Sequence, residues 1–420
     1  MRVLLVGAGG REHALAWKIA QSPLCEHLWI VPGNPGTATL GTNVDLAADD
    51  AAGIVGLATR EQIDLVVVGP EAPLVEGLGE VCDAVDLAMF GPSSEAAQLE
   101  GSKAFAKMIM LEAGVPTAAA HTFDDPAAAI AFVEAEQQAW VVKADGLAAG
   151  KGVIVPAAGD VAATISAIRE LVATNAGNRL VLEEILTGPE VSLLALCDGE
   201  RALPLIAAQD HKRIGDNDTG GNTGGMGAYA PAPILPYAEA QALVDVIFTP
   251  VLRTMAARNI PYRGVLYAGL MLTPNGVKVI EFNARFGDPE TQALLPLLKS
   301  DLLELLHKVA TSNLADVSIE WHDGAAVCVV LSAAGYPAKP RTGDVITGLD
   351  RLPSDVLAFQ AGTATNAQGD LVTAGGRVLG ITAVAPSLQE ARDKAYAASE
   401  LVEFAGKYQR SDIAARGLAE

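Results

Sequence analysis

In the second half of the chain the sequence reads Glu281-Phe282-Asn283-Ala284-Arg285-Phe286-Gly287-Asp288-Pro289-Glu290. Side chains two residues apart on a strand face the same side, so Glu281 and Asn283 are expected to lie together. Two oxygen ligands, completed by phosphate oxygens and water, are what Mg²⁺ prefers. Arg285 is expected on the same face, where its guanidinium can bind phosphate oxygens in a bidentate way. A surface strand would also alternate polar residues, but three matched residues followed by Gly-Asp-Pro favour a magnesium–phosphate site.

A glycine-rich loop lies upstream of this stretch. Lys143 ends a predicted strand, residues 140–143, that would point it into a cleft. The loop that follows carries three glycines and a lysine: Gly146, Gly150, Lys151 and Gly152. Backbone donors and mobile charge of this kind suit a lid over a triphosphate. The Walker spacing is absent, and the alternative interpretation is a solvated hairpin loop.

A second glycine-rich turn follows the first predicted strand and opens a helix. It reads Gly7-Ala8-Gly9-Gly10-Arg11-Glu12-His13. Glycines at that place let a phosphate approach the positive end of a helix. A dinucleotide site would want G-x-G-x-x-G, but position 12 is Glu. The turn therefore favours a smaller phosphate or sugar ligand, with a purely structural tight turn as the alternative.

Three further stretches carry polar side chains between predicted strands. The residues from Glu183 to Glu190 form a crossover that could offer backbone groups to an adenine edge, with Glu190 accepting from ribose hydroxyls. Paired acids are also common in solvated turns. The stretch Asp210-His211-Lys212-Arg213 is a dense charge cluster, and Asn222-Thr223-Gly224-Gly225-Met226-Gly227 could form an anion nest. For His211 we weigh substrate contact and a structural role equally.

The order of predicted elements indicates a multidomain α/β and α+β protein. Fully apolar strands separated by helices predict an N-terminal open parallel α/β sheet over residues 1–101. A central domain is predicted over residues 102–324, with a mobile lid subdomain at about 118–186. Residues 325–420 are predicted as a small β-rich domain with a closing helix from Leu388 to Phe404. Ligands of such sheets bind at the carboxyl ends of the strands.

Composition excludes several classes of function. The net charge of −21 repels nucleic acid and anionic membranes, and 5% aromatic residues are too few for a base-stacking groove. The longest apolar runs are strand-length, and the first residues predict a strand rather than a signal peptide. Four cysteines, far apart and without a CxxC pair, indicate reduced thiols and a cytoplasmic protein.

Together these stretches resemble the ATP-grasp superfamily and, within it, the phosphoribosylamine–glycine ligase family. The likeness runs in order through the chain and rests on these motifs: Gly7 to Ala14, Pro32-Gly33-Asn34, Gly69 to Leu74, Lys103, Lys143 to Gly152, Asp210 to Arg213, Asn222 to Gly227 and Arg285 to Glu290. Two departures lie in one loop, where the family usually has Gly at Asn217 and Pro at Gly221. Several relatives also have a third metal acid on the strand before Glu281, and this chain has none.

The resemblance implies that ATP, glycine and 5-phosphoribosylamine give ADP, phosphate and glycinamide ribonucleotide, with Mg²⁺ or Mn²⁺ held by Glu281 and Asn283. We expect a monomer and, from the net charge of −21, a protein that binds neither nucleic acid nor membrane. The implied ATP-binding residues are Lys103, Lys143, Gly150, Lys151, Gly152, Glu183, Glu184, Leu186 and Glu190. The implied substrate-binding residues are Gly9, Gly10, Arg11, Glu71, Asp210, His211, Lys212, Arg213, Asn222, Thr223, Gly224, Gly225 and Asp288. The implied catalytic residues are Lys143, Asp210 and Arg285.

The chemistry fits the residues apart from the resemblance. A carboxylate is a poor electrophile, and phosphorylation by ATP gives it a good leaving group; Mg²⁺, Lys143 and Arg285 can neutralise the charge of that transfer. Other hypotheses stay open: a formate-dependent or carboxylating purine enzyme, a nucleotide-binding oxidoreductase, and a non-catalytic ATP-binding regulator. The glycine-rich stretch at 222–227 and the stretch at 285–290 speak against the first, and the broken glycine motif against the second.

Overall fold

The computed structural model describes residues 1–147, 152–173 and 179–419. Its first part is an open parallel sheet in the order β3-β2-β1-β4-β5. The strands are β1 Arg2–Gly7, β2 His27–Pro32, β3 Thr42–Asn43, β4 Leu65–Val68 and β5 Met89–Phe90. The helices between and after them are α1 Gly10–Ile19, α2 Ala51–Glu61, α3 Glu71–Val75, α4 Leu78–Asp83 and α5 Ser94–Gly101.

Both faces of this sheet are covered, as its apolar strands predict. On β1, Leu5 shares a core with Leu15 of α1, whereas Leu4 shares a different core with Ile54 of α2. Neighbouring residues of a strand point to opposite faces, so both faces of β1 are buried. The N-terminal parallel sheet expected from the sequence is confirmed.

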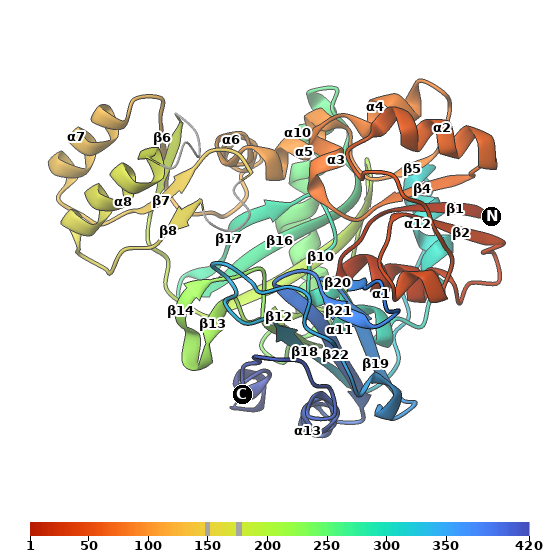
Figure 1. Ribbon diagram of the computed structural model, residues 1–420. Helices are drawn as coiled ribbons and strands as arrows, with labels where there is room; N and C mark the ends of the chain where they lie inside the picture. Colours follow the sequence, from red (N-terminus) through yellow and green to blue (C-terminus); the bar gives the residue numbers. More distant parts are fainter. Residues whose placement is uncertain (148–151, 174–178, 420) are drawn as a thin grey trace.

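The segment predicted as a lid folds as a separate lobe, on the left in Figure 1. Its antiparallel sheet has the order β6-β9-β7-β8. Its elements are β6 Ala120–Phe123, α7 Pro126–Glu136, β7 Val141–Ala144, β8 Val153–Ile154, α8 Val161–Ala173 and β9 Leu180–Glu183. Trp140, Val142 and Leu182 belong to a core of this lobe alone. A lobe with its own core is able to move as a unit.

The centre of the molecule is an antiparallel sheet in the order β11-β10-β16-β17. Its strands are β10 Glu190–Asp198, β11 Ala202–Pro204, β16 Arg263–Thr273 and β17 Gly276–Asn283. The helices of this part are α6 Lys103–Glu112, α9 Tyr237–Leu243, α10 Thr249–Ala257, α11 Glu290–Leu294 and α12 Leu302–Ala310. Strands β16 and β17 are those that the sequence predicts at 265–272 and 277–282.

One helical stretch, Tyr237–Ala257, is long and apolar enough to cross a membrane by length and composition alone. It consists of α9, a wider turn at Val244–Phe248 and α10. Its Leu252 and Met255 are fully buried in the core of the protein itself. The stretch is therefore weak evidence for a membrane span, because buried core helices show the same composition.

The C-terminal sheet has the order β12-β15-β18-β22-β19 and is antiparallel. Its strands are β12 Gln209–Asp210, β15 Gly227–Ala230, β18 Ala325–Ser332, β19 Val356–Gln360 and β22 Arg377–Ala385. Two short ribbons accompany it: β13 Arg213–Gly215 with β14 Thr219–Asn222, and β20 Thr363–Thr365 with β21 Leu371–Thr373. Strands β12 and β15 precede the predicted boundary at 325, so the sheet is built from both sides of that boundary.

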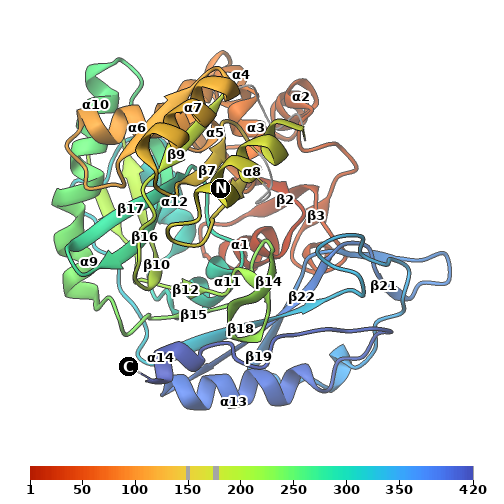
Figure 2. The same cartoon turned by 90° about the vertical axis from the view of Figure 1, so that its left-hand side faces the viewer.

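The closing helix is shorter than the sequence predicts. Helix α13, Leu388–Ser399, lies along the C-terminal sheet against β18 and β22 (Figure 2). Beyond Ser399 the chain leaves the helix, because Glu403 exchanges two backbone hydrogen bonds with Thr347, at 2.9 and 3.0 Å. A last helix, α14 Ala415–Ala419, was not predicted.

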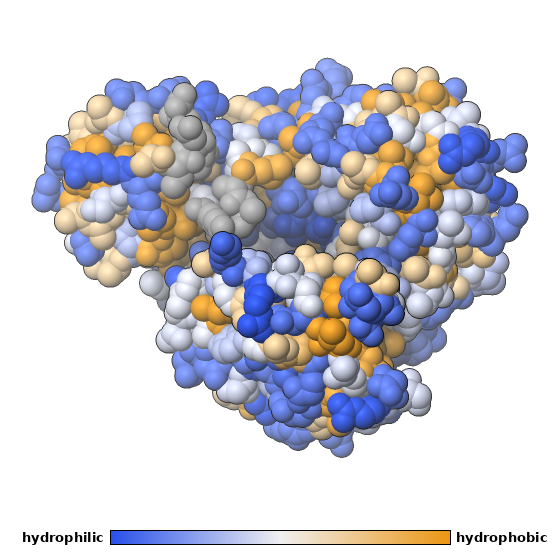
Figure 3. Space-filling view, viewed as in Figure 1, coloured by the Kyte–Doolittle hydropathy of each residue, from blue (hydrophilic) through white to orange (hydrophobic). Residues whose placement is uncertain are grey.

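These parts surround a hollow on the face shown in Figure 3. The lid lobe, the N-terminal part and the C-terminal part border it, and its floor is hydrophilic (Figure 3). In the same view, β10, β16 and β17 run through the centre of the molecule (Figure 1). The ends of these central strands are where the sequence places its charged motifs.

Candidate active site

The predicted metal pair lies at the end of β17. Glu281 is paired in register with Gly269 of β16, and Asn283 with Tyr267. The Glu281 side chain is 40% exposed. Burial alone would raise the pKa of Glu281, but the ammonium groups of Lys212, Lys143 and Lys103 outweigh burial and lower it. Glu281 is therefore held as an anion.

These two side chains fit a magnesium ion that also uses other ligands. One carboxylate and one amide oxygen supply the hard oxygen donors that Mg²⁺ takes, and substrate phosphates supply the rest. Within residues 1–147, 152–173 and 179–419, no group of three or more His, Cys, Asp or Glu side chains could hold a metal. The strand before Glu281 contributes no third acid, as the sequence indicates.

Arg285 does not continue the polar face of the strand, because β17 ends at Asn283. Beyond that point the chain turns, and the Arg285 guanidinium lies 3.1 Å from Glu100 and 3.4 Å from Glu71. Its Nη2 still donates to the Asn283 side-chain oxygen at 3.2 Å. Burial alone would lower the pKa of Arg285, but the two carboxylates raise it. Arg285 thus joins the metal strand to the N-terminal part, a contact that strand alternation could not predict.

Lys143 is held at the mouth of the lid lobe by two acceptors. Its Nζ lies 3.0 Å from Glu183 Oε1 and donates to the Ile280 carbonyl at 3.1 Å. A second lysine, Lys107 of α6, lies 3.1 Å from Glu183 Oε2. No sequence motif marked Lys107, because it lies in helix α6, far along the chain from the glycine-rich loop. Burial lowers the pKa of Lys107 to about 8.

Glu183 has a buried side chain, whereas the predicted adenine contact uses backbone groups of this segment. Its side chain is only 4% exposed and is engaged by both lysines, so it does not face an adenine ring in this conformation. The neighbouring Glu184 points outward and pairs with Lys278 at 3.2 Å, and Leu186 is half-buried. Alternation along β9 explains this, because adjacent side chains point to opposite faces.

The lid loop is described only in part. Gly150 and Lys151 lie outside the described residues, and Gly152 is buried directly before β8. Lys103, the first residue of α6, donates to the Gly146 carbonyl at 2.9 Å. Burial lowers the pKa of Lys103. Of the two predicted lysines, Lys143 thus belongs to the lid lobe and Lys103 contacts it from α6.

Lys212 lies among the acids of the candidate site. Its Nζ is 3.0 Å from Glu190 Oε2 and 4.0 Å from Glu281 Oε1. Burial alone would lower the pKa of Lys212, but Asp210, Glu190 and Glu281 raise it. Asp210, on β12, has its pKa raised to about 7, chiefly by burial. The predicted charge cluster and the predicted metal strand are therefore brought together by the fold.

His211 does not belong to this group of charged side chains. Its ring is 1% exposed, and neither ring nitrogen has a hydrogen-bond partner among the described residues. Burial lowers the pKa of His211 to about 3, helped by the nearby charges of Arg416 and Arg410. The ring is buried because His211 alternates with Asp210 and Lys212 along an extended segment. The structural interpretation of His211 fits this conformation better than substrate contact.

The glycine-rich stretch after β14 is anchored by Arg377 of β22. Its Nη1 donates to the carbonyls of Gly224, at 2.6 Å, and Asp288, at 2.8 Å. Its Nη2 lies 3.0 Å from Asp288 Oδ2. Thr223 donates its hydroxyl to the Lys212 carbonyl at 2.9 Å. The predicted residues Thr223, Gly224 and Asp288 are therefore neighbours, and Arg377 is a further residue that no sequence motif marked.

Asn222 and Arg213 are a cross-strand pair at the base of the β13–β14 hairpin. Gly225 lies beside residue 289: an added Cβ would be 2.4 Å from the Pro289 ring. The predicted substrate stretch is thus packed against the end of the metal-strand motif.

The N-terminal glycine turn is organised around Glu12. This carboxylate accepts from the Gly9 backbone at 2.6 Å and lies 2.5 Å from Arg11 Nε. A Cβ on Gly69 would be 2.0 Å from Glu12 Oε1, which explains the need for glycine there. Arg11 also donates to the Phe286 carbonyl at 3.1 Å. Gly10 and Glu71 border this turn, and Glu71 has its pKa lowered because Arg285 and Arg11 outweigh its burial.

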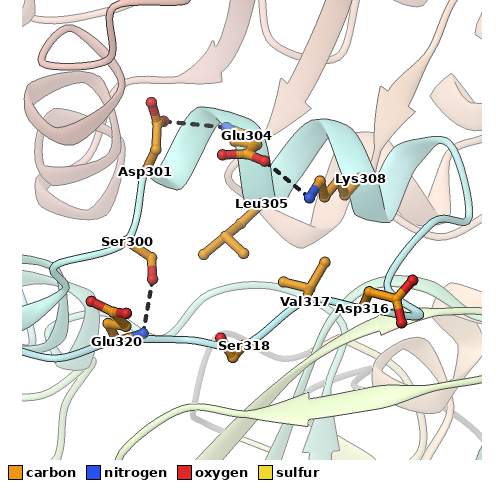
Figure 4. A pocket seen from close by; sticks show the side chains of 9 residues that line it. All are labelled: Ser300, Asp301, Glu304, Leu305, Lys308, Asp316, Val317, Ser318 and Glu320. Atoms are coloured by element: carbon orange, nitrogen blue, oxygen red, sulfur yellow. Dashed lines mark hydrogen bonds and ion pairs between the residues drawn. The ribbon is translucent and has the colours of Figure 1, made fainter.

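A separate cavity of about 300 Å³ lies between α12 and residues 316–320 (Figure 4). Glu304 and Lys308 of its lining form an ion pair at 2.9 Å. It contains none of the residues described above, and we assign it no chemistry.

Comparison with known proteins covers the whole chain. Family models of phosphoribosylglycinamide synthetase match it in three parts: the N domain over residues 1–100, the ATP-grasp (A) domain over 101–291 and the C domain over 326–416. The phosphoribosylamine–glycine ligase of Xanthomonas axonopodis pv. citri is 48% identical over 429 residues, covering 100% of this chain and 98% of its own. That of a Nostoc species is 51% identical over 423 residues, covering 99% of both.

Solved structures show the same likeness. The phosphoribosylamine–glycine ligase of Thermotoga maritima matches with a TM-score of 0.85 at 34% identity, covering 98% of this chain and 100% of that one. The biotin carboxylase of Campylobacter jejuni matches with a TM-score of 0.72 at 17% identity, covering 97% of this chain and 92% of its own. The latter similarity concerns the fold.

Proposed function

The chain belongs to the phosphoribosylglycinamide synthetase family, and from this premise we propose that it ligates glycine to 5-phosphoribosylamine. The reaction uses ATP and gives glycinamide ribonucleotide, ADP and phosphate, within purine (IMP) biosynthesis. One observation carries this proposal beyond the family: Lys212, beside Asp210, lies 4.0 Å from Glu281 of the metal pair. Groups suited to an amino acid thus adjoin groups suited to a metal-bound phosphate.

The pairing of Asp210 with Lys212 suits glycine itself. Glycine at neutral pH carries an ammonium and a carboxylate, so a site for it needs one group of each sign at short range. Asp210 would accept from the glycine ammonium, and Lys212 would hold the carboxylate toward the phosphate. The carbonyl and hydroxyl of Thr223 and the backbone at Gly224 and Gly225 would bind the activated form. Asn222, Arg213 and Asp288 complete this side of the site.

The nucleotide side is formed by the lid lobe and α6. Lys103 and Lys143 would bind phosphate oxygens, with Gly150, Lys151 and Gly152 closing over them. Backbone groups between Glu183 and Leu186 would hold the adenine, and Glu190 the ribose. When bound at Glu281 and Asn283, Mg²⁺ or Mn²⁺ supplies charge neutralisation for phosphoryl transfer. Gly9, Gly10, Arg11 and Glu71 would face the phosphoribosylamine.

The residues then support two successive steps. A glycine carboxylate oxygen attacks the γ-phosphorus of ATP, the bond from that phosphorus to ADP breaks, and glycyl phosphate forms. Lys143 neutralises the negative charge of the transferred phosphoryl group. Arg285 positions the Asn283 side chain by a hydrogen bond. The amine of phosphoribosylamine next attacks the glycyl carbonyl and loses a proton, and phosphate leaves with the original glycine oxygen. A closed lid protects glycyl phosphate from water.

Three finer statements belong to the same proposal. The chain works as a monomer in the cytoplasm, without nucleic acid or membrane as partners. Its functional domains are residues 1–101, 102–324 with the lid at about 118–186, and 325–420. These boundaries follow the separate sheets, although β12 and β15 attach the second domain to the sheet of the third.

A coupled assay of ADP release tests the reaction. Release should require both glycine and phosphoribosylamine, and a panel of other amino acids should replace glycine poorly. Equal turnover with formate and no glycine would overturn the proposal in favour of a transformylase. Turnover of NADH, followed by absorbance, would indicate an oxidoreductase. Tight ATP binding without hydrolysis in the presence of both substrates would indicate a regulator.

A further inference from the structure

The C-terminal segment 408–416 contacts the β13–β14 hairpin, which pairs with no strand of the larger sheets among the described residues. The grip centres on Arg410, whose side chain is fully buried. Its Nε and Nη2 bind both carboxylate oxygens of Asp412 at 2.7 Å. Its Nη1 donates to the Arg213 carbonyl and to Asp218, each at 3.0 Å. A rigid guanidinium fork thus links the tail to the base and the tip of the hairpin.

Other contacts repeat this link along the hairpin. Asp412 accepts from the Asn217 backbone at 2.8 Å, and the Ser411 backbone donates to Asp216 at 2.8 Å. The Tyr408 hydroxyl donates to the Ile214 carbonyl at 2.9 Å. Each bond joins groups about 195 residues apart in sequence, so the tail is the hairpin's external support.

The base of the hairpin is continuous with the proposed glycine site. Arg213, which Arg410 holds by its carbonyl, follows Lys212 directly and is paired across the hairpin with Asn222. The Thr223 backbone donates to the Lys212 carbonyl at 2.8 Å. A shift of the hairpin therefore moves Lys212 and Asn222 together. Displacements of about 1 Å far from the chemistry can reduce rates about 10²-fold.

The tail also accounts for an unusual residue in the hairpin. Asn217 has φ 54° and ψ 36°, a left-handed conformation that suits glycine and that Asn tolerates better than most residues. Its backbone N–H is the one that Asp412 accepts. At the other departure, Gly221, an added Cβ would meet no atom within 4 Å. Both departures are therefore compatible with the hairpin's shape.

We infer that segment 408–416 is a clasp that sets the position of the glycine site, with Arg410 as its positioning residue. The kinetic consequence of this inference rests on the proposed function. The contacts that form the clasp do not depend on it. Because the Arg410 side chain is fully buried, we assign it no contact with substrate. It fixes Arg213 and Asp218, and through them the backbone that carries Lys212 and Asn222.

The test compares three variants of the full chain. Arg410→Lys keeps the charge and loses the fork, and Tyr408→Phe removes a single bond from the clasp at a partly exposed position. Arg341→Lys is the matched control: Arg341 binds Asp344 and the Ala405 carbonyl in the C-terminal part but does not touch the hairpin. Hydrogen exchange of residues 211–227 is measured first, followed by kcat and KM for glycine and for ATP.

The clasp predicts faster exchange of residues 211–227 in Arg410→Lys and, to a smaller extent, in Tyr408→Phe. It predicts that KM for glycine rises about tenfold in Arg410→Lys while KM for ATP stays unchanged. A purely structural role would instead lower kcat with both KM values unchanged. Exchange and KM equal to those of Arg341→Lys would overturn the inference. If Arg410→Lys does not fold, Tyr408→Phe decides by exchange and KM. Failure of the wild-type protein to require glycine would refute the proposed function and leave the exchange result standing.

Discussion

Replacing Glu183 by Gln removes the one carboxylate that separates two buried lysines. Lys107 and Lys143 lie 3.1 and 3.0 Å from its two oxygens, and all three side chains are at most 5% exposed. Gln retains the size and can still accept hydrogen bonds, so the substitution changes charge more than packing. The Lys107 and Lys143 ammonium groups would then lose the carboxylate that both of them contact.

The expected cost follows from these distances. At an effective dielectric constant of about 20, opposite charges about 3 Å apart attract by ~5 kcal/mol. Removal of the buried carboxylate also relieves its own desolvation penalty, which is several kcal/mol. Breaking a buried pair by removing one partner costs a net ~3–5 kcal/mol, and we expect a loss of this size for Glu183→Gln.

Urea unfolding followed by tryptophan fluorescence, to which Trp140 in the core of the lid lobe contributes, measures this loss. Glu184→Gln is the control, because Glu184 is adjacent, 48% exposed and paired with Lys278 at the surface, where a pair is worth about 0–1 kcal/mol. Equal losses of unfolding free energy in the two variants, below about 1 kcal/mol, would refute the assignment of Lys107, Lys143 and Glu183 as a buried charged triad.

The same triad predicts how stability responds to pH. Burial puts the pKa of Lys107 at about 8 in the folded protein, below its ordinary 10.5. Between these values the unfolded chain binds more protons, so the contribution of Lys107 to stability rises with pH over that window. The Glu183 carboxylate raises the pKa of Lys107. Glu183→Gln therefore lets Lys107 lose its proton below pH 8, and the defect of the variant should shrink as the pH rises toward 8.

Two further predictions concern catalysis. Glu281→Ala should abolish turnover in the ADP assay while circular dichroism shows an intact fold, and unchanged turnover would remove Glu281 from the metal site. Because burial raises the pKa of Asp210 to about 7, its carboxylate is lost at lower pH, and kcat/KM for glycine should fall about tenfold per pH unit below 7. Since the folded pKa lies above the ordinary 3.8, the stability that Asp210 contributes at low pH is lost as pH rises through 7. Asp210→Asn should flatten the rate profile, and a retained slope would assign it to another group.

Local patterns predicted the elements that carry the site. Alternation on a strand sufficed to place Glu281 and Asn283 on one side, because β17 is regular as far as Asn283. Alternation did not predict the direction of the Arg285 side chain, because the strand ends before it. Two carboxylates of the N-terminal part determine that direction instead. Alternation could also have indicated that Glu183 and Glu184 face opposite ways.

Residues that act through distant contacts gave no signal in the sequence. Lys107 is identified only by its ion pair with Glu183. Arg377 is identified only by its hydrogen bond to Gly224, which is 153 residues away in the sequence. Arg410 reaches Arg213 across 197 residues. No local spacing encodes such pairs, because the sheets and the packing of the three parts bring them together.

In the proposed reaction, the carboxylate of glycine is activated by transfer of a phosphoryl group from ATP. Glycine labelled with ¹⁸O in its carboxylate tests this directly, with the released phosphate analysed by mass spectrometry after turnover with ATP and phosphoribosylamine. We expect one ¹⁸O atom in each phosphate released, because the glycine oxygen that attacks the γ-phosphorus leaves as part of the phosphate. Phosphate without label, formed at the same rate as glycinamide ribonucleotide, would contradict the proposed reaction.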